Sequence, residues 1–255
     1  MNPTAVRRAA LALLVLCACW TPGGARPAGA PKVLLLTHSA GFVHDVVKRP
    51  APDQPSLVER QLEDACRGQV ELVVSQDPGE ITAEKLKAYR AVAFYTSGEL
   101  PIDRDALLDY VKSGGGFVCI HNGMATLMKY PPYGEMVGAS FDGHPWNQEI
   151  GVRVEDAGHP STAHLGPSFR IKDEIYQVKN WKRADVHVLL SVDPSTVDLS
   201  KGKREDRDYA LAWTRDYGQG RVFYTALGHY AEVWKDERFL KHLVEGIRWA
   251  AAGPR

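Results

Sequence analysis

Short apolar segments alternate with helix-forming segments through the first half of this chain, and this alternation constrains the fold most. Each apolar run is four to seven residues long, as in strands buried on both faces, and the segments between the runs show helical spacing of apolar residues. Strands that alternate with helices predict a parallel sheet covered by helices. The predicted strands are VLLLT after Lys32, VELVVS at 70–75, AVAFYTS at 91–97 and FVCI at 117–120, and the predicted helices are 55–67, 82–89 and a third beginning at Pro101.

The second half has a different pattern. The segment YPPYGEMVGASFDGHPW at 130–146 is rich in loop residues, and the apolar stretches after it follow one another without helices between them. Such strands are expected to extend the same sheet in antiparallel fashion. They are IGVRVED at 150–156, FRIKDEIYQV at 169–178, VHVLLSV at 186–192 and YALAWTR at 209–215.

Tyr217–Gly220 is typical of a hairpin turn, and the last helix is expected over Glu237–Ala251. The chain therefore belongs to the α/β class, as a doubly wound sheet with a parallel core and added antiparallel strands. Residues 31–255 are expected to form one domain.

Residues 1–30 have the pattern of a signal peptide. Arg7 and Arg8 precede an apolar run from Ala9 to Trp20, and Ala28-Gly29-Ala30 is a suitable cleavage site before Pro31. We therefore expect an exported protein, periplasmic or secreted.

Two variants of this export signal stay open. Leu16-Cys17-Ala18-Cys19 could serve as a lipobox, with Cys19 carrying a lipid anchor, and the paired arginines could form a twin-arginine signal. In either case only Cys66 and Cys119 remain in the domain, which excludes a disulfide framework.

The charge balance argues against nucleic acid as a partner. Lysine plus arginine and aspartate plus glutamate each number 31, and no basic run or stripe stands out. The loop THSAGF lacks a glycine-rich phosphate cradle, so no nucleotide is expected either.

Two junctions, GGGFVCIHNG at 114–123 and GRVFYTALGH at 220–229, place a histidine where a strand should end. Ligands of open α/β sheets collect outside the carboxyl ends of the strands, so His121 and His229 are expected in that crevice. Cys119-x-His121-x-Gly123 also has the outline of a nucleophile elbow. An imidazole at this tip suits metal binding or proton transfer.

Other polar residues fall in loops or at strand ends. Together with His121 and His229, the histidines and carboxylates among these residues could hold a divalent transition metal such as zinc, iron, nickel or manganese. Glu174 is preferred to Asp173 as an acid or base, because neighbouring residues of a strand point to opposite faces. The predicted metal ligands are His38, His121, His144 and His229, and the predicted catalytic residues are His121, His229 and Glu174.

Aromatic residues accompany these histidines, in FDGHPW around His144 and in YAEVW after His229. Such rings either stack on a sugar or fill gaps beneath long loops. The predicted substrate-binding residues are Ser39, His44, Glu99, Asn122, Phe141, Trp146, Tyr176 and Trp234.

At these residues the chain resembles the ThuA-like (trehalose utilisation) family. The resemblance runs in order from Lys32 to Ala251, and it implies the flavodoxin-like fold of class I glutamine amidotransferases. The matching stretches are THSAGFVHD, AVAFYTSGEL, LLDYVKSGGGFVCIHNG, FDGHPWNQE, VRVEDAGHPSTAHLG, FRIKDEIYQ, DYALAWTRDYGQGRVFYTALGH and EVW.

The resemblance implies a role in sugar catabolism, as a lyase, hydrolase or isomerase of disaccharides or of their 3-keto derivatives made by a partner sugar 3-dehydrogenase. His121 takes the elbow position that cysteine holds in amidotransferases, and His229 is similar to their late histidine. Without a thiol at the tip, glutamine hydrolysis is not expected.

The sequence leaves two alternatives open. A non-catalytic carbohydrate-binding module would need the aromatic residues, Trp146 above all, but neither a metal nor a titrating group. Redox or nucleotide binding is suggested by flavodoxin-like topology alone and ranks last. No oligomeric state is predicted.

Overall fold

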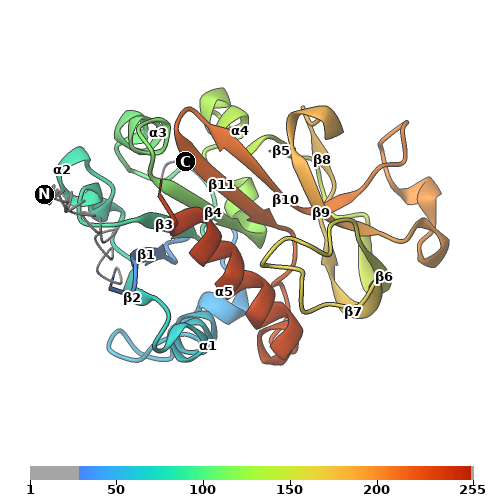
Figure 1. The fold of residues 1–255 in the computed structure, drawn as a ribbon, viewed down its shortest axis with the longest axis horizontal. Helices are drawn as coiled ribbons and strands as arrows, with labels where there is room; N and C mark the ends of the chain where they lie inside the picture. The colour runs from blue at the N-terminus through green and yellow to red at the C-terminus, as the bar shows by residue number, and fades with distance from the viewer. Residues whose placement is uncertain (1–28, 254–255) are drawn as a thin grey trace, which may run out of the picture.

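The computed structural model describes residues 29–253, which are built around a nine-stranded sheet (Figure 1). The strand order is β2-β1-β3-β4-β11-β10-β9-β6-β7. Their bounds are β1 Lys32–Leu36, β2 Glu71–Ser75, β3 Ala91–Phe94, β4 Gly116–Ile120, β6 Trp146–Val154, β7 Ser168–Ile175, β9 His187–Val192, β10 Ala210–Tyr217 and β11 Gly220–Thr225. A separate small sheet pairs β5 (Ser140–Phe141) with β8 (Val178–Lys179).

The sheet has a parallel half and an antiparallel half, which confirms the predicted fold class. Strands β2, β1, β3, β4 and β11 run parallel to one another, whereas antiparallel pairings join β10 to β11 and then β10, β9, β6 and β7 in turn. The predicted hairpin is present, because Tyr217 pairs with Gly220 between β10 and β11. The order of the parallel strands is that of flavodoxin-like sheets.

Helices cover both faces of the parallel half. Helices α1 and α5 contact each other and lie on one face, and Figure 1 shows α3 and α4 on the other side of the sheet. This is the doubly wound arrangement that the alternating segments predicted. The helices are α1 Leu57–Cys66, α2 Ala83–Leu86, α3 Arg104–Lys112, α4 Pro131–Val137 and α5 Glu237–Ala251.

Two helix predictions were wrong in detail. Helix α3 does not begin at Pro101, because the side chain of Asp103 accepts the N–H of Ala106 and caps the helix there. Helix α4 lies within the segment expected to be loop. Pro131 starts it and Gly138, with a left-handed φ of 93°, ends it, so residues that normally mark loops here mark the two ends of a short helix.

Residues 1–28 of the predicted signal peptide, with Cys17 and Cys19, lie outside the described residues. Within 29–253, none of the helices combines the length and the apolar character needed to span a bilayer. Cys66 and Cys119 are both buried and free, in agreement with the absence of a disulfide framework.

Candidate functional site

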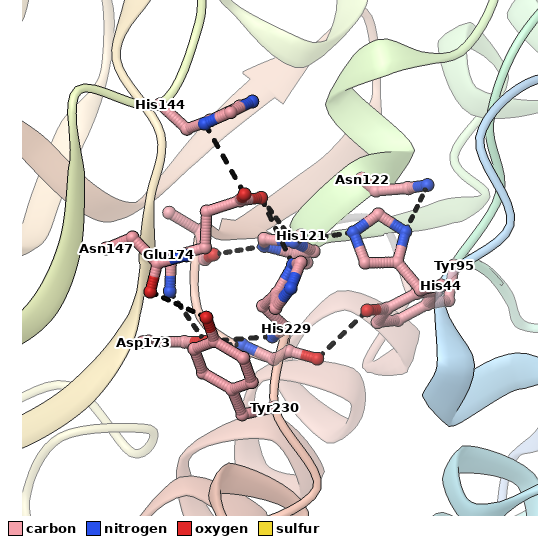
Figure 2. A network of polar contacts seen from close by, with 12 residues as sticks. His44, Tyr95, His121, Asn122, His144, Asn147, Asp173, Glu174, His229 and Tyr230 are labelled. Carbon is pink, nitrogen blue, oxygen red and sulfur yellow. Dashed lines mark hydrogen bonds and ion pairs between the residues drawn. The ribbon is translucent and has the colours of Figure 1, made fainter.

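Three histidines and one glutamate face one another at the carboxyl edge of the sheet (Figure 2). One ligand atom from each of His44, His121, Glu174 and His229 lies within 4.8 Å of the others. The loops after β1, β4 and β11 supply the histidines, and β7 supplies the glutamate. The topology thus brings together residues that lie far apart in the sequence.

His121 occupies a strained elbow after β4. Its φ of 45° is in the left-handed region, which costs a non-glycine residue free energy. A Cβ at Gly123 would lie 2.7 Å from the carbonyl oxygen of Phe94, so the turn needs glycine there. Nδ1 of His121 donates to the carbonyl of Ala226 at 2.6 Å, which leaves Nε2 unprotonated and facing the cluster.

His44 packs edge-on against His121, with ring centroids 4.9 Å apart. Its Nε2 lies 3.2 Å from Nε2 of His121, and its Nδ1 lies 2.9 Å from the Asn122 amide. Burial lowers the pKa of His44 to about 4, with a further contribution from His229. Burial also holds the pKa of His121 well below 6.5. Both imidazoles are therefore neutral at physiological pH, the form that binds a cation.

Glu174 presents one oxygen to each side of the site. Its Oε2 lies 3.1 Å from Nδ1 of His229 and 3.7 Å from Nε2 of His121, while Oε1 lies 3.4 Å from Nδ1 of His144. Burial alone would lower the pKa of His229, but the Glu174 carboxylate raises it. Burial likewise opposes ionisation of Glu174, yet the contact with His229 lowers its pKa. Glu174 and His229 thus favour an ion pair.

Asp173, the neighbour of Glu174 in β7, holds the loop that carries His229. Its carboxylate accepts the backbone N–H of Gly228 at 2.6 Å and that of His229 at 3.0 Å. Complete burial raises the pKa of Asp173 to about 7, although these N–H donors oppose the rise. The sequence indicated correctly that Glu174 alone of the pair faces the crevice, but it did not reveal this supporting role of Asp173.

The four side chains fit a divalent cation. Nδ1–H of His121 donates a hydrogen bond to a backbone carbonyl, as the second ring nitrogen of a metal-bound histidine does. Nδ1 of His229 is buried and points into the cluster, where it lies 3.1 Å from Oε2 of Glu174. His44 can offer Nε2 if the Asn122 amide turns its oxygen toward Nδ1, and that oxygen is also buried and unpaired. Three imidazoles and a carboxylate suit zinc, iron, nickel or manganese.

The predicted ligand set needs correction. His38 is not part of the cluster, because its Nδ1 bonds to the carbonyl of Gln76 beside β2. His144 contacts Glu174 but lies outside the four-residue group, and its side chain is 52% exposed. His44, expected to bind substrate, takes the place predicted for His38. Glu99 accepts the backbone N–H of Lys129 and is not among the converging residues.

The two tryptophans expected to bind substrate are core residues. Trp146 is 1% exposed and donates to the carbonyl of Asp198, and Trp234 is fully buried and donates to that of Gly228. Neither ring can stack on a sugar in this structure, because other side chains and loops cover both.

Of the remaining predicted residues, Tyr176 and Asn122 contact histidines of the cluster directly. Tyr176 packs on His121 with ring centroids 4.3 Å apart, and Phe141 packs on Tyr176 at 4.6 Å. Asn122 contacts His44, as described above, and Ser39 pairs with Ser97 where the loops after β1 and β3 meet.

A family model named ThuA and described as trehalose utilisation matches residues 32–250. The chain belongs to the ThuA family. This match covers the whole described sheet and both strand-end histidines that the sequence singled out, and it confirms the resemblance noted from the motifs.

Solved structures of ThuA-like proteins share the fold. A ThuA-like protein from Bacteroides uniformis is 24% identical with a TM-score of 0.68, and the match covers 90% of this chain and 95% of that chain. One from Parabacteroides merdae is 22% identical with a TM-score of 0.66, covering 87% and 90%. A cytoplasmic protein from Salmonella typhimurium is 12% identical with a TM-score of 0.55, covering 88% and 100%. No curated protein matches this chain.

The fold is that of glutamine amidotransferases, but in this ThuA-family chain the elbow carries no thiol. His121 occupies the tip, while Cys119, two residues earlier in β4, is fully buried, and burial raises its thiol pKa. A protonated, inaccessible thiol cannot serve as a nucleophile.

Proposed function

We propose that this protein is an enzyme of sugar utilisation that acts on a disaccharide or a 3-keto-glycoside. The observation that carries the proposal is the convergence of His44, His121, His229 and Glu174 at the carboxyl edge of the sheet, in a family described as trehalose utilisation. A protein that only binds sugar would not need three imidazoles around one carboxylate. The aromatic basis for that alternative is also weaker, because Trp146 is buried.

A divalent transition metal fits the proposal. His44, His121 and His229 would hold it together with Oε2 of Glu174. Bound there, such an ion would supply Lewis-acid polarisation of a sugar carbonyl.

Side chains of the protein would move the proton that the reaction removes from the substrate. In a 3-keto-glycoside, the hydrogen on C2 is acidic because it lies beside the carbonyl. Oε1 of Glu174, which lies 3.4 Å from Nδ1 of the exposed His144, would accept this proton. The electron pair left on C2 can then expel the substituent at C1, which leaves with a proton from water or His144. Elimination would break the glycosidic bond without the two flanking carboxylates of ordinary glycosidases.

The keto group must come from an oxidation step. We therefore propose that a sugar 3-dehydrogenase supplies the substrate, and that the protein works after export, in the periplasm or outside the cell, as its N-terminal pattern suggests.

Metal content is the most direct test. Residues 31–255, purified without a histidine tag, would be analysed by inductively coupled plasma mass spectrometry beside His121→Ala and the control His187→Ala, which removes an exposed histidine bonded to Asp156. About one equivalent of a transition metal is expected in the wild type and the control but not in His121→Ala. Equal metal in all three proteins, or none that binds even after incubation with zinc or manganese, would overturn the metal assignment.

Turnover tests the enzyme assignment separately. His121→Ala is expected to abolish conversion of a 3-keto-glycoside while circular dichroism stays unchanged. An active variant would contradict the proposed mechanism.

A further inference from the structure

Phe42 is an exposed aromatic residue beside the histidine cluster. Its side chain is 69% exposed, and the other large hydrophobic residues that are exposed within 29–253 are Val43 and Met128. Its ring lies edge-on to His44, with centroids 4.8 Å apart, and His44 lies 4.8 Å from His229. His44 therefore contacts both the Phe42 ring and His229, the most accessible histidine of the cluster.

The loop that carries Phe42 is fastened to its neighbour. Ala40 donates its N–H to the carbonyl of Ser97 at 2.8 Å, and the Ser97 hydroxyl donates to the carbonyl of Phe42 at 2.7 Å. The backbones also touch, because a Cβ at Gly98 would lie 2.5 Å from the nitrogen of Gly41. The backbone that carries the exposed ring is thus fixed before any ligand arrives, which lowers the entropic cost of binding.

The Phe42 ring is accessible for stacking on a ligand and is not part of the core. The buried Trp146 and Trp234 cannot offer a stacking surface, and Tyr176 is 4% exposed. Phe42 leaves most of its ring open to solvent next to the proposed reaction site. A flat apolar face in this position suits the C–H face of a sugar ring or an aromatic ring.

We propose that Phe42 forms the subsite for the ring-bearing leaving portion of a glycoside. This inference rests on the proposed function, in which the sugar that reacts lies over Glu174 and His229. The leaving group then extends from C1 past His44 toward Phe42. Either the second sugar of a disaccharide or an aromatic aglycone offers the ring that this face accepts.

Three glycosides used as probes distinguish a second sugar ring from an aromatic aglycone. Methyl α-D-glucopyranoside has no second ring, trehalose has a second sugar ring, and p-nitrophenyl α-D-glucopyranoside has an aromatic one. Their dissociation constants would be measured by saturation-transfer NMR and calorimetry for residues 31–255, Phe42→Ala and the control Val43→Ala, whose own side chain is 41% exposed.

At least one ring-bearing probe is expected to bind about tenfold more tightly than the methyl glycoside. Phe42→Ala should remove this advantage without changing the affinity for the methyl glycoside, and Val43→Ala should change neither. Whichever ring-bearing probe loses affinity identifies the source. Equal affinity of wild type and Phe42→Ala for both ring-bearing probes would overturn the subsite.

Other outcomes of the same experiment would overturn the proposed function. If the methyl glycoside binds and His229→Ala does not weaken it, the reacting sugar does not lie at the cluster, whatever Phe42 does. If none of the three probes binds, either as the glycoside or as its 3-keto derivative, both the subsite and the glycoside assignment are overturned.

Discussion

Asp173 accepts the backbone N–H of His229, with 3.0 Å between Oδ1 and the nitrogen, while its neighbour Glu174 contacts the side chain of the same histidine. Two consecutive residues of β7 therefore fix both the loop and the ring of His229. Strand residues alternate in direction, so one carboxylate reaches the backbone beneath the site and the other reaches the site itself. The geometry of the cluster depends on this pair as well as on the histidines.

Asp173→Asn should weaken metal binding without touching a ligand. The amide keeps the shape of the side chain but turns one acceptor into a donor, so either Gly228 or His229 loses its partner. Loss of such support typically lowers metal affinity 10- to 100-fold, and we expect a loss in this range. Calorimetric titration with zinc or manganese would measure it, and an unchanged dissociation constant would show that Asp173 does not position His229.

Glu174→Gln should lower the pKa of His229. In the wild type the carboxylate raises that pKa against the effect of burial, and the neutral amide removes the attraction while burial remains. The pKa is therefore expected to fall, as followed by NMR titration of the imidazole in metal-free protein. In the wild type, metal affinity should accordingly rise with pH until His229 has lost its proton. A His229 pKa that does not change in Glu174→Gln would contradict the ion pair.

The strand ends could be predicted from the sequence, and the path of the loops could not. His121 and His229 follow their strands directly, so the topology rule placed both at the site. His38 also follows a strand, but its ring turns to Gln76, and the chain returns to the site six residues later at His44. No periodic pattern in the sequence marks such a return, so the sequence assigned His38 to the cluster where the structure has His44.

The burial of individual aromatic residues could not be predicted from the sequence either. Trp146 begins a strand that sequence alone could not distinguish from a loop, and the segment that contains Asp198 folds over its indole. Phe42, in contrast, lies in a loop of small and polar residues with no pattern that marks its exposure. Burial in both cases depends on distant parts of the chain.

Trp146→Ala should therefore reduce stability rather than sugar affinity. Removing a buried indole costs about 3–5 kcal/mol of unfolding free energy, and the carbonyl of Asp198 also loses its donor. Urea unfolding would measure the loss, and the affinity for trehalose, measured well below the melting temperature, should stay within twofold of the wild type. A large loss of affinity with unchanged stability would show that Trp146 is a substrate-binding residue.

His242 in α5 should make the protein sensitive to acid. The side chain is buried, Nδ1 donates to the carbonyl of Ser161 at 2.9 Å, and burial lowers the pKa of His242 to about 4. The unfolded chain takes up a proton near pH 6.5, whereas the folded protein resists protonation until about pH 4. Between these values the unfolded state binds more protons, so the free energy of unfolding falls as the pH falls.

His242→Gln keeps a donor for Ser161 but cannot be protonated. The variant should show a shallower dependence of unfolding free energy on pH between 6.5 and 4, by about 1.4 kcal/mol per pH unit, since one fewer proton is taken up on unfolding. Urea unfolding at several pH values would measure both slopes. The exposed neighbour Lys241 provides the matched control, because Lys241→Gln in the same helix should leave the slope as it is. Equal slopes for the wild type and His242→Gln would mean that His242 is already protonated in the folded protein.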